Sequence, residues 1–437
     1  MRIRRSILIL MAFFSFGFVS APSGAGEYDF DIPEAEKKPW EAGGRLETRY
    51  LYHRLDEDSA RYRLNYYQDP PGADSHEWRG LAELSGSYRF GFAQANLLTH
   101  HEYAATYKAD DWTHDIYEGY VSLTPTARLT LDAGKRRILW GKGYAWNPVG
   151  FLNRPKDPDD PALNLEGRVL LGLDLIKSFP AGHLTNIGLT ALLLPVIDDW
   201  ANEELGDEGD LNFAIKLYLL WRDTDLDFIC FDGPDQPLGL GFDFSKNLAE
   251  NFEVHGELAF RDDVPRVVID PSGDTRQTRK DQLGWLLGIR YLNALDTTFI
   301  AEYYHNGGGY NRDEVEDFFT FQDAAFDQWR TTRDPSPMAR ADRITRPYYQ
   351  QRNYGEDYFY LKVLQKEPFD ILYFNPWAAV VVNLQDWSVN FQPGMTWTPL
   401  TNLELNFRVS VPVGGSKTEF GEKPDALRPE IWARYYF

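Results

Sequence analysis

The stretch RPEIWARYYF, residues 428–437, ends the chain on an aromatic side chain with no polar tail after it. Apolar residues fall on every second position, at Ile431, Ala433, Tyr435 and Phe437. Side chains of a β-strand alternate between two faces, so this pattern predicts a terminal strand with one apolar face. A soluble domain usually frays at its terminus, because nothing holds the last residues in place. The apolar face therefore needs a surface to meet.

The same alternation recurs along the whole chain and predicts 18 strands, with 16 the next alternative. The expected strands lie near 45–52, 82–90, 93–98, 117–123, 128–133, 169–175, 187–193, 213–222, 224–231, 238–244, 252–260, 287–291, 299–303, 359–363, 377–381, 389–397, 403–411 and 431–437. Short links follow the even-numbered strands, and mostly long links follow the odd-numbered ones. Outer-membrane barrels alternate tight periplasmic turns with longer outward loops in this way.

The sequence thus predicts an all-β fold, a transmembrane antiparallel up-and-down β-barrel, and the apolar face of the last strand would meet lipid. A soluble sandwich also has alternating strands, and a soluble propeller is a further all-β alternative. A propeller would show a blade repeat of roughly 40–50 residues, and the sequence shows none. The C-terminal pattern ending in Tyr435 and Phe437 resembles the assembly signal of Gram-negative outer-membrane proteins, which implies the barrel-assembly machinery as a partner.

The N-terminus carries Arg2, Arg4 and Arg5, then an apolar stretch and an A-x-A-like site that ends at Ala25. This is the pattern of a cleaved secretory signal peptide, predicted at 1–25. The apolar stretch is too short for a spanning helix, which needs about 20 residues. We expect a short periplasmic segment at 26–43 and the barrel at 44–437, in the outer membrane of a Gram-negative bacterium.

Composition excludes several classes of protein. The net charge is −21, and clustered basic residues are what nucleic-acid binding requires, so we expect no nucleic-acid partner. Cys230 is the single cysteine, so there is neither an intramolecular disulfide nor a zinc–thiolate site. The acidic runs at 202–210 and 313–317 match no EF-hand spacing, and we expect no metal and no cofactor.

Charged side chains of both signs are expected on the lumen face of the strands. Rows of opposite charge across a pore favour hydrated polar solutes, although such pairs also simply satisfy one another along the wall. The candidates for pore lining are Arg45, Arg49, Arg136, Arg290, Arg408, Glu118, Asp132, Glu257 and Glu302. An 18-strand barrel leaves an aqueous lumen, so loops must form any constriction.

The longest loop, 307–356, is rich in arginine within an otherwise acidic chain. Interleaved with tyrosines, these residues could fold inward as an anion-selecting or sugar-stacking constriction. The alternative is an exposed loop that binds lipopolysaccharide phosphates. The arginines are Arg330, Arg333, Arg340, Arg343, Arg346 and Arg352.

A second long loop, 139–167, lies within the stretch GKRRILWGKGYAWNPVGFLNRPKDPDDP at 134–161. Gly141 and Gly143 permit tight backbone geometry beside Trp140, Tyr144 and Trp146, aromatic residues that suit a membrane interface. The "WG…NP" segment after a "G-K/R-Q/R" strand resembles Gram-negative porin-like and alginate-export-like families. This resemblance implies an outer-membrane channel for a polar solute, a carbohydrate or an organic anion. The mixed lumen charge departs from a basic alginate conduit.

The expected function is passive diffusion of small polar or anionic solutes, by a monomer or a homotrimer surrounded by outer-membrane lipid and lipopolysaccharide. The alternatives are an alginate-like polysaccharide export channel, a barrel that binds a surface polymer, and an outer-membrane lipid-modifying enzyme. An enzyme is the weakest of these, because neither G-x-S-x-G nor H-E-x-x-H occurs in the chain. His100 and His101 are a histidine pair near an expected outer rim, but we expect no catalytic residue.

Overall fold

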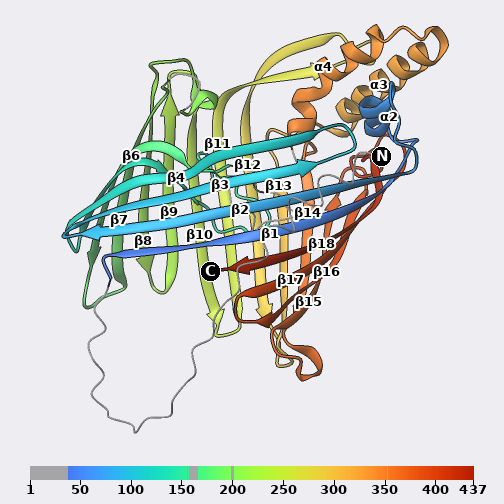
Figure 1. The fold of residues 1–437 in the computed structure, drawn as a ribbon. Coiled ribbons are helices and arrows are strands. Elements are labelled where there is room, and N and C mark those ends of the chain that lie inside the picture. The colour runs from blue at the N-terminus through green and yellow to red at the C-terminus, as the bar shows by residue number, and fades with distance from the viewer. Residues whose placement is uncertain (1–37, 155, 157–165, 198–200, 352) are drawn as a thin grey trace. The chain divides into compact units, whose positions relative to one another are not determined.

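A computed structural model describes residues 38–154, 156, 166–197, 201–351 and 353–437. These residues form an antiparallel sheet of 18 strands in sequential order, which closes because β1 pairs with both β2 and β18 (Figure 1). The strands are β1 (Trp40–Leu55), β2 (Asp74–Phe90), β3 (Ala93–Ala105), β4 (Asp110–Thr126), β5 (Leu129–Arg136), β6 (Arg168–Ser178), β7 (Leu184–Pro195), β8 (Leu211–Trp221), β9 (Thr224–Gly233), β10 (Gln236–Ala249), β11 (Phe252–Ile269), β12 (Thr275–Leu292), β13 (Thr297–His305), β14 (Asp357–Gln365), β15 (Phe374–Asn383), β16 (Val389–Leu400), β17 (Leu403–Val413) and β18 (Asp425–Tyr436).

The predicted β-barrel and its 18 strands are confirmed. The start of the barrel differs from the expected one: β1 begins at Trp40 and includes residues that were expected in the periplasmic segment at 26–43. Several strands are longer than the alternation indicated; β11 and β12, for example, continue to a turn at 270–274. The predicted signal peptide at 1–25 lies outside the described residues.

The terminal strand closes the barrel. Arg45 pairs with Tyr436 and Tyr50 with Ile431 in the β1–β18 register. The backbones of Gly44 and Phe437 exchange two hydrogen bonds, with N···O distances of 3.0 and 3.1 Å. Closure removes the free edge that an apolar terminal strand would otherwise expose to other chains.

The two faces of the wall differ as the alternation predicts. Leu46, Leu84 and Ile431 are about half exposed on the outer face, while Glu47 and Glu83 are nearly inaccessible on the inner face. A hydrocarbon surface accepts apolar side chains only, which accounts for the apolar outer positions in the middle of these strands. Within the described residues, no helix has both the length and the apolar character needed to cross a membrane.

Helices occur in the long connections, at the end of the barrel where β1 finishes and β2 starts (Figure 1). They are α2 (Ala60–Tyr66), α3 (Arg312–Thr332) and α4 (Ser336–Gln350), with 3₁₀ turns η3 (Glu203–Leu205) and η4 (Pro368–Asp370) elsewhere. Asn311 and Glu314 form a capping box that starts α3, each side chain accepting a hydrogen bond from the other's backbone N–H.

These helices pack around a hydrophobic core of their own, which includes Leu64 of α2, Phe318 and Phe319 of α3, and Tyr348 of α4. Ile269 at the end of β11 belongs to the same core. Because the core joins the β1–β2, β11–β12 and β13–β14 connections, it links distant parts of the rim. We call residues 56–73 and 306–356 together the cap.

Candidate functional site

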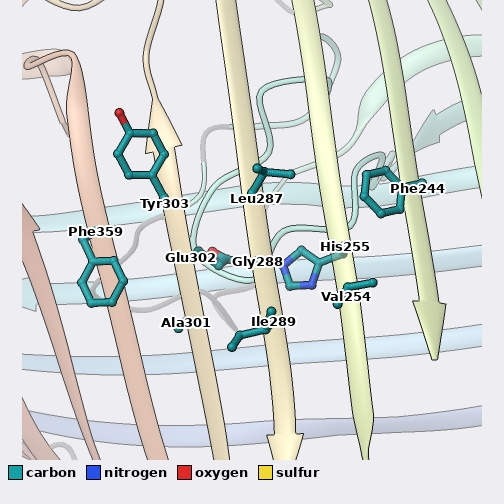
Figure 2. A pocket seen from close by; sticks show the side chains of 10 residues that line it. All are labelled: Phe244, Val254, His255, Leu287, Gly288, Ile289, Ala301, Glu302, Tyr303 and Phe359. Carbon is teal, nitrogen blue, oxygen red and sulfur yellow. Dashed lines mark hydrogen bonds and ion pairs between the residues drawn. The ribbon is translucent and has the colours of Figure 1, made fainter. Parts of the chain in front are cut away.

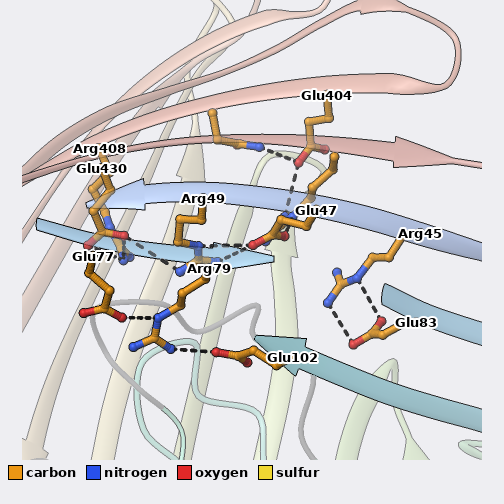
Figure 3. Close-up of polar contacts among 12 residues, drawn as sticks. Arg45, Glu47, Arg49, Glu77, Arg79, Glu83, Glu102, Glu404, Arg408 and Glu430 are labelled. Atoms are coloured by element: carbon orange, nitrogen blue, oxygen red, sulfur yellow. Dashed lines mark hydrogen bonds and ion pairs between the residues drawn. The ribbon is translucent and has the colours of Figure 1, made fainter. Parts of the chain in front are cut away.

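One side of the inner wall, on β1–β3 and β17–β18, carries ionic groups that pair with one another (Figure 3). Arg45 Nε lies 2.8 Å from Glu83 Oε2, and Arg408 Nη2 lies 2.9 Å from Glu430 Oε2. Further pairs join Arg49 to Glu47, Arg79 to Glu77 and Glu102, and Arg434 to Glu47 and Glu404. We call this set the paired-charge wall. The wall thus carries the charges of both signs that were predicted for the lumen, and each arginine has a glutamate beside it.

The opposite side of the barrel interior is covered by residues 137–154, which we call the inward loop. It leaves the wall at the end of β5 and is held by side chains of β11 and β13. Glu257 of β11 accepts hydrogen bonds at Oε1 from the backbone N–H groups of Lys142 and Gly143, at 2.6 and 2.7 Å. The Glu257 carboxylate also accepts from Asn147 Nδ2 at 2.9 Å and from the Val149 N–H at 3.2 Å.

Glu302 of β13 is the second anchor of the inward loop. Its two carboxylate oxygens accept hydrogen bonds from the backbone N–H groups of Tyr144 and Ala145. His255 Nε2 lies 2.9 Å from Glu302 Oε1, so the imidazole holds the carboxylate from the wall side. Gly288 lies between His255 and Glu302 in the register, and a Cβ at this position would lie 2.1 Å from His255 Nε2. Only glycine leaves room for this contact.

Cationic groups of the inward loop complete its attachment. Lys142 Nζ lies 2.9 Å from Asp227 Oδ2 of β9 and 3.8 Å from Asp243 Oδ1 of β10. These aspartates are directly opposite each other in the β9–β10 register and are buried. Lys142 therefore places a positive charge beside two buried carboxyl groups of the wall.

The inward loop also has apolar contacts with the wall, which the sequence did not indicate. Trp140, Val149 and Leu152 pack in a core against inner-face residues of β6–β9 and β11. Trp146 packs against Leu286, Tyr358 and Tyr360 in a second core. The expected interfacial location of Trp140 and Trp146 is therefore wrong, because both indoles are buried inside the barrel, 6% and 7% exposed. The lumen face here is apolar where a loop covers it and excludes water.

A second segment, 414–424 between β17 and β18, joins the inward loop to the cap; we call it the latch loop. Its Glu419 carboxylate is buried and accepts hydrogen bonds from Tyr358 Oη, Asn383 Nδ2 and Asn353 Nδ2. Asn353 Oδ1 in turn accepts from Trp146 Nε1 of the inward loop at 3.1 Å. Phe420 packs in the same core as Trp146. Burial raises the pKa of Glu419 from its ordinary value of 4.5 to about 7.

Two cavities lie on the wall. The first, of about 230 Å³, is lined by polar and apolar groups at the start of the inward loop, including Arg136, Arg137, Trp140, Asp174 and Lys216. Arg136, Arg137 and Lys216 supply positive charge to this cavity, and Asp174, which lies 3.4 Å from Arg136 Nη1, supplies a carboxylate, so the cavity suits a small polar group.

The second cavity is a groove of about 350 Å³ on β10–β14 (Figure 2). Phe244, Leu287 and Ile289 are among its apolar lining residues, while His255 and Glu302 belong to the inner face. The outer-face lining makes this groove part of the apolar outer surface.

The predicted pore residues fall into three sets. Arg45, Arg49 and Arg408 belong to the paired-charge wall, while Glu257 and Glu302 anchor the inward loop. The rest lie at other contacts: Arg136 with Asp132 and Asp174, Glu118 as acceptor from the Arg137 N–H, and Arg290 beside the Tyr144 hydroxyl. Sequence reasoning missed Asn147, Asn353 and Glu419, and only the "NP" within the WNP motif hinted at one of them.

The arginines that were predicted to form a constriction lie on exposed helices and not inside the barrel. Residues Arg330, Arg333, Arg340, Arg343 and Arg346 are exposed on α3, α4 and the turn between them. Arg352 lies outside the described residues. The segment that folds into the barrel is the inward loop, because its apolar residues and backbone N–H groups have partners on the wall. Among the described residues, no three histidine, cysteine or acidic side chains gather as a metal site.

Comparison with known proteins now adds to this geometry. No protein-family model and no curated protein matches the sequence. The chain is similar in structure to the outer membrane protein OprD of Pseudomonas aeruginosa, with 10% identity, a TM-score of 0.50, and coverage of 91% of this chain and 93% of that one. OccK2 (OpdF) of the same organism, solved in complex with glucuronate, has 10% identity and a TM-score of 0.51, with coverage of 91% and 98%.

A third solved structure is Wzi of Escherichia coli, described as an outer membrane protein involved in group 1 capsule assembly and as a carbohydrate-binding β-barrel. It has 10% identity and a TM-score of 0.52, with coverage of 90% of this chain and 84% of that one. At these identities the likeness concerns the fold. The chain has the fold of these outer-membrane β-barrels, an antiparallel barrel of 18 strands.

Proposed function

We propose that this protein is an outer-membrane channel through which small polar or anionic solutes diffuse passively. The observation that carries the proposal is the inward loop, held on one side of the barrel by Glu257 and Glu302 and facing a wall of paired charges on the other. A loop fixed in this way narrows the lumen. The remaining passage runs along charged groups.

The paired-charge wall determines what passes. Each cation there has a carboxylate within hydrogen-bond distance, so a solute meets alternating donors and acceptors and no uniform potential. Hydroxylated and carboxylated solutes exchange hydrogen bonds with such a wall as they shed water. Weak ion selectivity follows from this arrangement.

The polar cavity beside Arg136, Arg137 and Lys216 supports the anionic part of the proposal. OccK2, a barrel of the same fold, was solved with glucuronate, a small sugar acid. A small solute of this kind suits a cavity of about 230 Å³ whose lining includes three cationic side chains and one carboxylate. We infer that a sugar acid or a similar organic anion is among the solutes.

A second candidate function is binding or export of a surface polysaccharide. The cap favours it, because the α2, α3 and α4 core and the latch loop cover part of one barrel end. Wzi, which has the same fold, is described as a carbohydrate-binding β-barrel. No catalytic step is part of either proposal.

The test is single-channel conductance of the refolded full-length protein in planar bilayers, with the reversal potential measured under a KCl gradient. We expect stable open steps with a reversal potential near zero, and closure in groups of three would indicate a homotrimer. Glucuronate should block or slow the current in a concentration-dependent way. An inserted, folded protein that never conducts would refute the channel and favour the polysaccharide-binding barrel.

A further inference from the structure

The outer surface of the cap carries a cluster of exposed arginines, of which Arg330, Arg343 and Arg346 contribute little to the packing of the cap. On α4, Met338, Ala341, Thr345 and Tyr348 form the buried face. Arg340, Arg343 and Arg346 recur every third residue on the opposite side, and Arg330 and Arg333 end the preceding helix. Successive arginines on α4 are about 4.5 Å apart along the helix axis.

The contacts of these arginines contribute little to folding. Arg330 pairs with Asp327 and Arg346 with Asp342, each a neighbour on the same helix, and both guanidinium side chains are about two-thirds exposed, 67% and 65%. Exposed pairs of this kind are worth little stability. Arg343 has no hydrogen-bond or ion-pair partner among the described residues. Two arginines have structural contacts: Arg340 donates to the carbonyl oxygens of Ser272 and Gly273, and the Arg333 guanidinium lies 4.9 Å from the Trp329 ring centroid.

The charge of this segment contrasts with the rest of the chain. Residues 330–346 contain five arginines and only two acidic residues, in a protein with a net charge of −21. The whole 307–356 segment contains arginine but no lysine. Arginine presents a planar fork that binds phosphate oxygens in pairs, whereas lysine acts as a point charge. The use of arginine alone therefore favours binding of a phosphorylated partner over a role of these charges in keeping the protein soluble.

The cap holds these side chains on a rigid surface. The helices pack around Phe318, Phe319 and Tyr348, and Arg266 of β11 ties Glu314 to the barrel rim. A surface that is already ordered loses little conformational entropy when it binds a ligand. The cap lies at the barrel end with the long connections, where a barrel of this class meets the outer leaflet.

We propose that the exposed arginine face of α3 and α4 binds the phosphorylated saccharide of lipopolysaccharide, and so ties the cap to the surrounding leaflet. Basic segments next to a membrane bind anionic headgroups in proportion to their number of positive charges. The cap is then held in place at the barrel end. This proposal does not depend on whether the barrel conducts.

The experiment measures binding of purified lipopolysaccharide to the full-length protein refolded in a neutral detergent. The triple variant Arg330→Gln/Arg343→Gln/Arg346→Gln removes three positive charges while it keeps Arg340 and the cap core. We expect its affinity to fall roughly tenfold or more. The matched control Arg128→Gln/Lys177→Gln/Arg222→Gln removes three exposed charges at the opposite end of the barrel and should change the affinity less than about twofold.

Chemically dephosphorylated lipopolysaccharide should bind the unaltered protein as weakly as intact lipopolysaccharide binds the triple variant. Equal affinity for both forms, or an equal loss in the control, would overturn the proposal. Tighter binding of polygalacturonate than of lipopolysaccharide would also overturn it and indicate an acidic polysaccharide as partner. If the triple variant fails to refold, as judged by heat-modifiable mobility, Arg343→Gln alone should still lower the affinity roughly threefold.

Discussion

Glu257 illustrates how a lumen carboxylate differs from what its position in the sequence indicates. Alternation predicts correctly that it points inward, but its oxygens bond to the backbone of the inward loop and not to a solute. Hydrogen bonds to a charged acceptor contribute about 1.5–3 kcal/mol each in net terms. A chain position gives no sign of such contacts, because the donors come from residues more than a hundred positions away.

Replacement of Glu257 by glutamine should loosen the inward loop. The NH₂ group of the glutamine is a donor, and it would replace an oxygen that now accepts hydrogen bonds from backbone N–H groups of the loop. We expect a loss of about 2–3 kcal/mol in the local stability of the loop. Hydrogen exchange of the Lys142 and Gly143 amides measures this loss directly. Glu404→Gln is the control, since Glu404 bonds to Asn406 and Arg434 on the paired-charge wall. Unchanged exchange at Lys142 and Gly143 would contradict the anchoring role.

Gly288 is the second residue whose identity matters for the site. A methyl group there would overlap the His255 ring and move it away from Glu302, so we expect Gly288→Ala to destabilise the barrel by about 1–3 kcal/mol. The midpoint of urea unfolding in detergent measures the change. Gly80→Ala is the control, because a Cβ at Gly80 meets no atom within 4 Å. Equal effects of the two substitutions would show that the His255 contact is unimportant.

At the scale of elements, the three long connections differ in what they do. The inward loop buries its indoles against the wall, the cap forms helices with their own core, and the latch loop connects the two through Glu419. Helix signals were present at 311–314, where Asn311 and Glu314 have capping-box spacing before an apolar run.

The latch loop should respond to pH. Below about pH 4.5, Glu419 is protonated whether the loop is docked or free, so docking is strongest. Between about 4.5 and 7 the free loop ionises while the docked carboxyl, whose pKa is about 7, stays protonated, and docking weakens as the pH rises. Above about pH 7 the docking free energy stops falling, and the total loss is about 3 kcal/mol or less. The charged and titratable groups that face Glu419 are Tyr354, Tyr358, Asp386 and Lys423.

Hydrogen exchange of the latch loop between pH 4 and 8, corrected for intrinsic rates, tests this expectation. Opening should become more frequent as the pH rises from about 4.5 to 7. Glu419→Gln should make opening independent of pH in this window while it keeps the loop docked. A latch loop that opens more readily at acidic pH would refute the expected direction of the pH dependence. If the Glu419→Gln variant keeps the same pH dependence of exchange, another group titrates.

At the scale of the whole molecule, the pairing of β1 with β18 closes the barrel, and Phe437 extends this pairing by one residue. Phe437 exchanges two backbone hydrogen bonds with Gly44, and a Cβ on Gly44 would lie 2.8 Å from its ring. The outward location of Tyr435 and Phe437, 42% and 54% exposed, is consistent with their predicted role in the assembly signal. That role remains a prediction.

Deletion of Phe437 should slow insertion and leave β1 and β18 less well paired. We expect a loss of about 1–2 kcal/mol in stability from the missing hydrogen bonds, and a larger loss in assembly yield. The fraction of heat-modifiable protein in isolated membranes measures assembly, and refolding in detergent measures stability alone. Phe437→Tyr is the control that keeps a terminal aromatic ring. A deletion that inserts as efficiently as the full chain would remove Phe437 from the assembly signal.

The sequence by itself determined the number of strands, the closure of the barrel and the inward direction of charges such as Arg45 and Glu302. They follow from the two-residue period of the apolar residues, because side chains alternate between the faces of a strand and lipid accepts only the apolar face. This period can be read from neighbouring residues. The tertiary structure alone decided that residues 137–154 enter the barrel, that Trp140 and Trp146 are buried there, and that Arg330–Arg346 lie on exposed helices. Those outcomes depend on partners such as Glu257, Leu286 and Glu419, which are distant in sequence and meet only when the closed sheet brings their strands around one lumen.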